Sequence, residues 1–322
     1  MDSSTLLSTL ALVLASSSPL VLAVVGETLT EKAGVVNLSL DGAILLSAMV
    51  GFAVAFLTGS LILAFLAAML VGALAAGLIA FSSIVLKLDQ IAVGFVLTML
   101  CTDLSTFFGN PFVRIRGPSV PDLPIPLLKD IPVAGKLFFS QNAVVYFSFA
   151  VVAAAWWWIY RTRPGLEMQA AGERPAAAFA RGMNVNLQRF VYTVAGGALV
   201  GFAGASYSLF VKLGWSYHAT SGLGWIALAI VIFGGWHPVR GAIGAYLFGA
   251  LQSMGSFAQG WFPGIPTQVF QTAPFALMIV ALLLVGNDAV DRFFVGSPVS
   301  RKIWQTLRGT PPAALGTSFE QE

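Results

Sequence analysis

Long apolar segments separated by short polar connections organise this chain. A transmembrane helix needs about 20 mostly apolar residues to cross a hydrocarbon core of about 30 Å. The apolar runs cover residues 5–25, 34–56, 60–84, 90–108, 142–160, 190–211, 224–236, 240–258 and 268–286. This pattern predicts an all-α fold, a polytopic transmembrane helical bundle of about eight to ten spans.

Two of the runs predict discontinuous helices. The 224–236 run is too short to cross the core as a helix. We expect either a half-helix or a re-entrant unit formed together with the 240–258 run. The 34–56 run opens with the polar stretch 33–42, which reads AGVVNLSLDG. Helices interrupted at membrane depth line cavities, and many transporters build their solute sites from them.

The polar stretch 33–42 holds the first candidate solute-path residues. Asn37, Ser39 and Asp41 are costly in hydrocarbon, so we expect them to face a cavity or protein rather than lipid. Gly34 and Gly42 make an irregular backbone easy at this point. Three roles stay open for Asp41: a local turn or cap, a cavity lining, and a proton relay.

Small residues recur at four-residue spacing in two runs. Small side chains at such positions allow two helix backbones to approach closely. We therefore expect tight helix packing along both sets, which are Gly197, Gly201 and Ala205 in one run and Gly241, Ala245 and Gly249 in the other.

Composition agrees with a membrane protein. Hydrophobic residues make up 57% of the chain and charged residues 10%, against about 25% charged residues in soluble domains. The net charge of +3 does not indicate a nucleic-acid partner, because Lys and Arg in a membrane protein mostly report topology. Cys101 is the single cysteine, so it forms no internal disulfide and is interpreted as a small buried side chain.

Positive charge orients the predicted bundle. With the N-terminus outside, the inside loops 27–33, 85–89, 161–189 and 237–240 and the tail after 286 hold 12 of the 17 Lys and Arg residues. This bias predicts a cytoplasmic C-terminus. No positive residue precedes Lys32, so we expect the first run to be a retained span rather than a cleaved signal. The outside loop 109–141 carries four positive residues and six prolines and is interpreted as an ordered excursion.

These boundaries divide the chain into two parts. Residues 1–290 are predicted to form the transmembrane domain, with 161–189 as a cytoplasmic loop. Residues 291–322 are predicted to form a polar, loosely ordered cytoplasmic tail.

Catalytic and nucleotide motifs do not occur in the sequence. It contains no Walker A motif, no H-E-x-x-H motif and no G-x-S-x-G motif, and it has only two histidines. We therefore expect no catalytic residues, no metal site and no bound cofactor. Energy for uphill transport would have to come from a partner or an ion gradient. An ion-coupled carrier needs ionisable residues within the membrane, and the candidates are Asp41 and Asp103.

The 161–189 loop predicts a short helix suited to docking. Residues 172–175 (GERP) interrupt the chain and start a helix with Pro175 in its first turn and an acid near its positive end. Residues 176–181 have high helix propensity, and Gly182 ends the helix. With Phe179 protruding, this helix fits a groove on another protein. An ordinary amphipathic connector is the alternative.

Three blocks of the sequence resemble a known family. They are residues 31–42 (EKAGVVNLSLDG), 170–185 (AAGERPAAAFARGMNV) and 224–238 (GWIALAIVIFGGWHP). Together they resemble the permease subunits of bacterial ABC importers in the branched-chain amino acid, ribose and nucleoside group. Within that group the chain looks most like the simple-sugar and nucleoside permeases. The resemblance extends from about residue 5 to 290, and the second block is its most specific part.

The resemblance implies roles for named residues. It implies that the ATPase coupling helix comprises Gly172, Glu173, Arg174, Pro175, Phe179, Arg181 and Gly182. It also implies that 37–42 and 224–238 lie near the translocation path. Aromatic residues at cavity-compatible places in the spans include Phe95, Tyr207, Phe210, Trp225, Phe233 and Trp236. The candidate path residues are Asn37, Ser39, Asp41, Phe95, Trp225, Phe233 and Trp236. The family usually has Glu at position 41, Asn at position 174 and a residue other than His at position 237.

The implied function is a permease subunit of an ATP-driven importer. The chain would form half of the path for a small neutral polar solute, a nucleoside or a simple sugar, because few charges lie near the path. Implied partners are an ABC ATPase, which binds the ATP, a second homologous or identical permease, an extracytoplasmic substrate-binding lipoprotein and the lipid bilayer. The expected location is the bacterial plasma (inner) membrane.

Three alternatives stay open at this stage. The first is a permease for branched-chain amino acids. The second is an ion-coupled secondary carrier that acts without an ATPase. The third is a membrane enzyme or scaffold, for which the sequence offers no catalytic constellation.

Overall fold

The computed structural model describes residues 3–220, 222–262, 309–321 and isolated positions between 264 and 279. Six helices in these parts are long and apolar enough to cross a membrane. They are α1 (Ser3–Lys32), α2 (Leu40–Thr58), α3 (Leu61–Ile84), α4 (Gln90–Gly109), α5 (Ala143–Arg161) and α8 (Val185–Ser206). This architecture confirms the predicted all-α polytopic bundle. The 268–286 run and residues 291–308 of the tail lie outside the continuously described parts.

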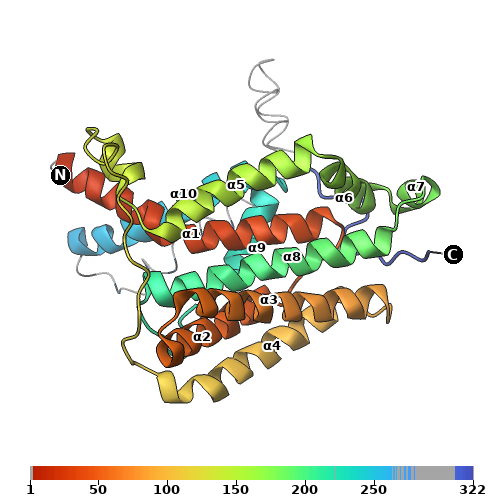
Figure 1. The fold of residues 1–322 in the computed structure, drawn as a ribbon, viewed down its shortest axis with the longest axis horizontal. Helices are drawn as coiled ribbons and strands as arrows, with labels where there is room; N and C mark the ends of the chain where they lie inside the picture. The colour runs from red at the N-terminus through yellow and green to blue at the C-terminus, as the bar shows by residue number, and fades with distance from the viewer. Residues whose placement is uncertain are drawn as a thin grey trace.

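The long helices lie side by side, with their axes along the longest dimension of the molecule (Figure 1). Helix α8 packs against α3 on one side and α1 on the other. A Cβ atom on Gly72 of α3 would overlap the Gly197 carbonyl, and one on Gly201 of α8 would overlap the Ala68 carbonyl. The predicted close packing along Gly197 and Gly201 is thus confirmed, with α3 as the neighbour.

Two interruptions divide the bundle. Residues 33–39 are not helical, and Gly34 has a φ of 97°, which a residue with a side chain rarely adopts. Helix α9 (Leu223–Phe233) has 11 residues, so it extends over about 16 Å, roughly half of a bilayer core. A turn at 234–237 then leads into α10 (Pro238–Trp261). Both discontinuities were predicted.

Two predicted boundaries were wrong. The apolar pattern ends the first run at 25 and predicts a loop at 27–33, but α1 continues to Lys32 because protein buries its polar residues, Glu27 among them. The helix of the second run begins at Leu40, within the predicted irregular stretch 33–42. Helix α8 begins at Val185 rather than 190, because the Asn184 side chain accepts a hydrogen bond of 3.0 Å from the Leu187 N–H and caps the helix there.

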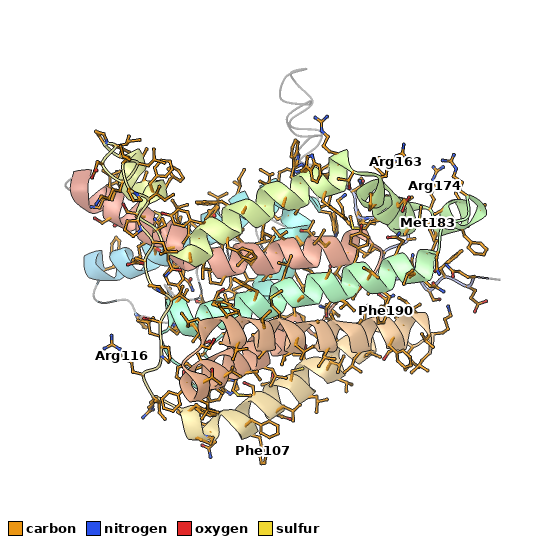
Figure 2. The ribbon with its side chains drawn as sticks, in the orientation of Figure 1. Phe107, Arg116, Arg163, Arg174, Met183 and Phe190 are labelled. Carbon is orange, nitrogen blue, oxygen red and sulfur yellow. The ribbon has the colours of Figure 1, made fainter. Side chains whose placement is uncertain are left out.

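The two ends of the bundle carry different structures (Figure 1). The N-terminus and the loop with η1 (Asn110–Phe112) and η2 (Gly135–Phe139) lie at one end. Helices α6 (Arg163–Glu173) and α7 (Pro175–Ala180) and the last described residues lie at the other. Figure 2 shows Arg163, Arg174 and Met183 around α6 and α7, with Arg116 at the opposite end. We call these the loop end and the α7 end.

Candidate functional site

The interruption between α1 and α2 is enclosed by protein. Asn37 and Ser39 are 1% and 0% exposed. The Asn37 side-chain oxygen accepts hydrogen bonds from the N–H and the hydroxyl of Ser39, at 3.1 and 2.7 Å, and forms a side-chain turn ahead of α2. The Leu38 carbonyl accepts a hydrogen bond of 2.7 Å from the Thr98 hydroxyl. These contacts give hydrogen-bond partners to backbone groups of the non-helical segment, which lipid could not provide.

Asp41 joins two of the sequence blocks. Its Oδ1 accepts a hydrogen bond of 2.9 Å from the N–H of Gly224, in the first turn of α9. A Cβ atom on Gly224 would overlap the Asp41 backbone, so only glycine permits this approach. Asp41 therefore acts as a cap, but for the start of α9 rather than for its own helix.

The candidate aromatic residues separate into two groups. The rings of Phe95 on α4 and Trp225 on α9 lie 5.6 Å apart between centroids, next to the Asp41 contact. Phe233, at the other end of α9, lies against Gly244 of α10. Trp236 is buried, and its Nε1 donates a hydrogen bond to Glu31. The structure thus brings Phe95 and Trp225 to the α2–α9 junction and places Phe233 and Trp236 away from it.

Sequence reasoning missed two buried acids. Glu27 and Glu31 are 0% and 4% exposed. Glu27 Oε1 accepts a hydrogen bond of 3.2 Å from the Asn37 N–H, so α1 holds the interruption directly. Their four-residue spacing, which puts both on one helix face, was the available signal. The polar residues after position 25 obscure this signal in the apolar pattern. Asp103, the other candidate acid in the sequence, is exposed.

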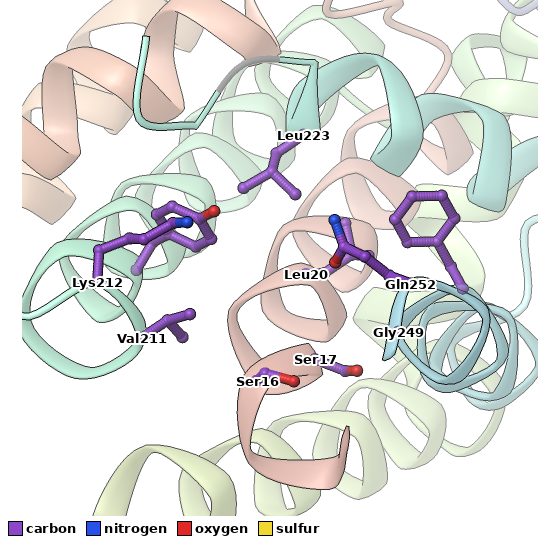
Figure 3. A pocket seen from close by; sticks show the side chains of 10 residues that line it. Ser16, Ser17, Leu20, Val211, Lys212, Leu223, Gly249 and Gln252 are labelled. Carbon is purple, nitrogen blue, oxygen red and sulfur yellow. The ribbon is translucent and has the colours of Figure 1, made fainter. Parts of the chain in front are cut away.

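A cavity of about 170 Å³ opens between α1, η3 (Tyr207–Val211), α9 and α10 (Figure 3). It offers two rings and several hydrogen-bonding groups, and none of the seven predicted path residues lines it. The Ser17 hydroxyl is buried and has no hydrogen-bond partner in the described part of the chain. The lining residues are Ser16, Ser17, Leu20, Tyr207, Val211, Lys212, Leu223, Phe248, Gly249 and Gln252.

The predicted short helix is present as α7. Pro175 occupies its first turn, and Gly182, with a φ of 84°, follows its end. Beside it lies a groove of about 470 Å³ that Arg174, Arg181 and Glu173 help to line. Phe179 is 37% exposed.

Two further features of this region appear only in the structure. Glu173 directly precedes Arg174, the N-cap of α7, as predicted, and its Oε2 also accepts a hydrogen bond of 3.1 Å from the N–H of Ala313 in the C-terminal segment. An additional helix, α6, precedes α7 and begins where the Thr162 hydroxyl accepts a hydrogen bond of 3.2 Å from the Gly165 N–H. The signal for α6 was a threonine two residues ahead of Pro164, a common pattern at a helix start.

Comparison with known proteins covers most of the chain. A family model described as the permease component of branched-chain amino acid transport systems matches residues 9–282. The putative glucose ABC transporter permease protein TsgC13 of Haloferax volcanii is 37% identical, over 74% of this chain and 74% of its own length. No solved structure matches the chain significantly.

Two bacterial relatives match over a longer stretch. The nucleoside ABC transporter permease protein NupC of Lactococcus lactis is 33% identical, over 85% of this chain and 90% of its own. The guanosine ABC transporter permease protein NupQ of Bacillus subtilis is 33% identical, over 83% and 88% respectively.

Proposed function

The chain belongs to the family of permease components of branched-chain amino acid transport systems, and we propose that it forms half of the membrane path through which an ATP-driven importer takes up a nucleoside or simple sugar. It is a multi-pass membrane transport protein rather than an enzyme. Its relatives named for nucleosides, guanosine and glucose favour this solute class over branched-chain amino acids.

The observation that carries the proposal is α7. A six-residue helix at one end of the bundle, with a 37% exposed phenylalanine and two arginines beside a groove, has the form of an insert for a partner's cleft. We assign that partner as the ABC ATPase. ATP is bound there, so this chain itself carries no cofactor. The α7 end is then cytoplasmic, the loop end faces the substrate-binding lipoprotein, and the membrane is the bacterial plasma (inner) membrane.

The cavity at the loop end supports a neutral polar solute. The rings of Tyr207 and Phe248 suit the face of a nucleobase or a sugar. The Ser16, Ser17 and Gln252 side chains suit hydroxyl groups. Further along the path, the α2–α9 junction with Asp41, Trp225 and Phe95 would form the gate.

A chain of contacts connects the loop that carries α7 with the α2–α9 junction. A Cβ atom on Gly172, at the end of α6, would overlap the Lys32 carbonyl at the end of α1, so the coupling loop presses on the helix that precedes the interruption. Glu27 of α1 holds Asn37, and Asp41 holds α9. Movement of α7 by the ATPase would thus reach the gate through α1 and α2, with alternating access as the result.

The test is purification of the tagged chain from its native membrane, followed by reconstitution. We expect an ATPase and a second permease, homologous or identical, in fixed ratio. We also expect ATP-dependent uptake of guanosine or glucose into receptor-loaded proteoliposomes. Competition by leucine instead would indicate branched-chain amino acids. Uptake by the chain alone, driven by an ion gradient, would overturn the proposal. The candidate ion-coupling residues would then be Glu27, Glu31 and Asp41.

A further inference from the structure

The C-terminal segment 309–321 was expected to be loosely ordered, yet it is bound along the α7 end of the bundle. Ala314 N–H donates to the Gly172 carbonyl at 2.9 Å, and Gly316 N–H donates to the Gly34 carbonyl at 3.1 Å. A Cβ atom on Gly309 would overlap the Gly235 backbone. The segment therefore touches all three sequence blocks: the interruption before α2, the coupling loop and the α9–α10 turn.

A buried cation fastens this segment. Arg189 of α8 is 2% exposed. Its guanidinium donates to the carbonyls of Thr317, Ala171 and Ala314 at 2.6, 3.2 and 3.4 Å. Burying a guanidinium is costly unless carbonyls or charges receive its hydrogen bonds. Two of these three carbonyls belong to the C-terminal segment, so the segment and Arg189 stabilise each other.

The same segment places a second aromatic ring beside α7. Phe319 is half-buried, packs against the apolar cluster of Ala171, Ala178 and Val185, and meets the Phe179 ring edge-to-face at 6.0 Å. Lys87, from the α3–α4 connection, donates a hydrogen bond of 2.7 Å to the Phe319 carbonyl and holds the end of the segment.

We propose that the ATPase binds a composite surface, in which Phe319 of the C-terminal segment and Phe179 of α7 form one apolar ridge and Arg189 is the positioning residue that keeps Phe319 in place. This inference rests on the proposed function. The exposed side chains of Arg174 and Arg181 lie beside the ridge. The matching partner surface is an apolar cleft with an acidic rim, and continuity with α7 identifies the ATPase as the occupant.

The test uses the whole complex with full-length and variant permease. Phe319→Ala is expected to weaken ATPase association about five- to tenfold, the loss typical of an aromatic anchor. Phe190→Ala is the matched control, because Phe190 has the same 37% exposure as Phe179 but lies on α8. Deletion of 309–322 is expected to abolish association while receptor binding at the loop end persists.

Arg189→Lys tests the positioning role. Lysine keeps the positive charge, but its ammonium group lacks the planar arrangement of donors with which the guanidinium binds several carbonyls at once. We expect faster hydrogen exchange in 314–319 and weaker ATPase association, with Arg181→Lys leaving exchange in 314–319 unchanged. If Phe319→Ala binds the ATPase within about twofold of the parent, the composite surface is wrong. If the parent chain itself binds no ATPase, the proposed function fails instead. Phe319→Ala decides the case should the deletion reduce membrane insertion.

Discussion

At the scale of single residues, polar side chains inside this bundle connect segments that lie far apart in the sequence. Asp41 accepts a hydrogen bond from the start of α9, Glu27 from the interruption before α2, and Glu31 from Trp236 after α9. Each acid lies on a helix next to the 33–39 break and accepts a hydrogen bond from a segment outside its own helix. Costly intramembrane acids are thereby placed at the junction that we propose as the gate.

Substitution of Asp41 can show whether its cap on α9 affects uptake more than an ordinary helix cap does. Asp41→Ala leaves the Gly224 N–H without its acceptor and should lower uptake about fivefold or more, since a lost cap costs about 1 kcal/mol or more. Asp41→Asn keeps an acceptor oxygen and should retain most activity. Ser60→Ala, which removes the exposed cap of α3, is the control. Equal uptake in Asp41→Ala and Ser60→Ala would remove Asp41 from the gate.

His237, between α9 and α10, predicts a pH dependence. Burial, with repulsion from Arg240 and Lys32, lowers its pKa from 6.5 to about 4. The unfolded chain takes up the proton near pH 6.5 and the folded chain only near pH 4. Stability is therefore complete above about pH 6.5 and declines as the pH falls towards 4.

The measurement is the melting temperature of the purified protein between pH 7.5 and 4.5. His237→Phe keeps a ring against Tyr160, whose ring lies 5.1 Å from the imidazole, and removes the titration. It should flatten the decline. Parallel curves for parent and variant would show that His237 does not contribute.

At the scale of elements, glycine positions decide how closely helices pack. A Cβ atom at Gly72 would overlap the Gly197 backbone, whereas one at Gly77, also on α3, would lie 3.6 Å from the Val194 side chain. Gly72→Ala should destabilise the bundle by about 1–3 kcal/mol through overpacking. Gly77→Ala should be neutral. Similar melting temperatures for the two variants would contradict the α3–α8 packing.

Helix α7 gives a second prediction at this scale. Phe179→Ala should reduce ATPase association and ATP-dependent uptake about fivefold or more, because the exposed ring is the anchor assigned to the partner's cleft. Pulldown of the ATPase with purified permease measures it. Phe190→Ala, on α8 with the same exposure, should behave like the parent. If both variants bind equally well, residues 172–182 are not the coupling helix.

The sequence predicted elements better than the contacts among them. Periodicity and length gave the long helices, the short α9 and the break at 33–39, because local composition determines them. The sequence did not predict the full length of α1, because its last turns contain Glu27 and Glu31. These acids are tolerated there because distant segments of the chain bury them, and local apolarity does not report such burial. The partners of Glu173 and Arg189 lie in the C-terminal segment more than 100 residues away, at separations of 140 and 128. No spacing rule within a helix reports such pairs.

At the scale of the whole molecule, the proposed solute cavity and α7, the proposed ATPase-binding helix, are separate regions of the bundle. The cavity lies at η3, which follows the last residue of α8, whereas α7 precedes the first residue of α8. Substitutions that share no contacts act almost independently. The two proposed functions should therefore be separable by substitution in one protein.

Ser17 tests that separation. Ser17 lines the cavity, and its buried hydroxyl, next to Gly249, has no partner in the described structure, so we expect the hydroxyl of a bound solute to complete it. Ser17→Ala should raise the KM for uptake about three- to tenfold, the effect of one lost hydrogen bond, and leave ATPase association unchanged. Ser18→Ala is the matched control, because the Ser18 hydroxyl already donates to the Ala15 carbonyl at 2.8 Å.

The double variant with Ser17→Ala and Phe179→Ala tests whether the two regions are independent. The effect of Ser17→Ala on KM and the effect of Phe179→Ala on ATPase association should each be as large as in the single variants. A KM unchanged by Ser17→Ala would place the solute elsewhere, and a loss of ATPase association in that variant would mean that the two ends are not independent.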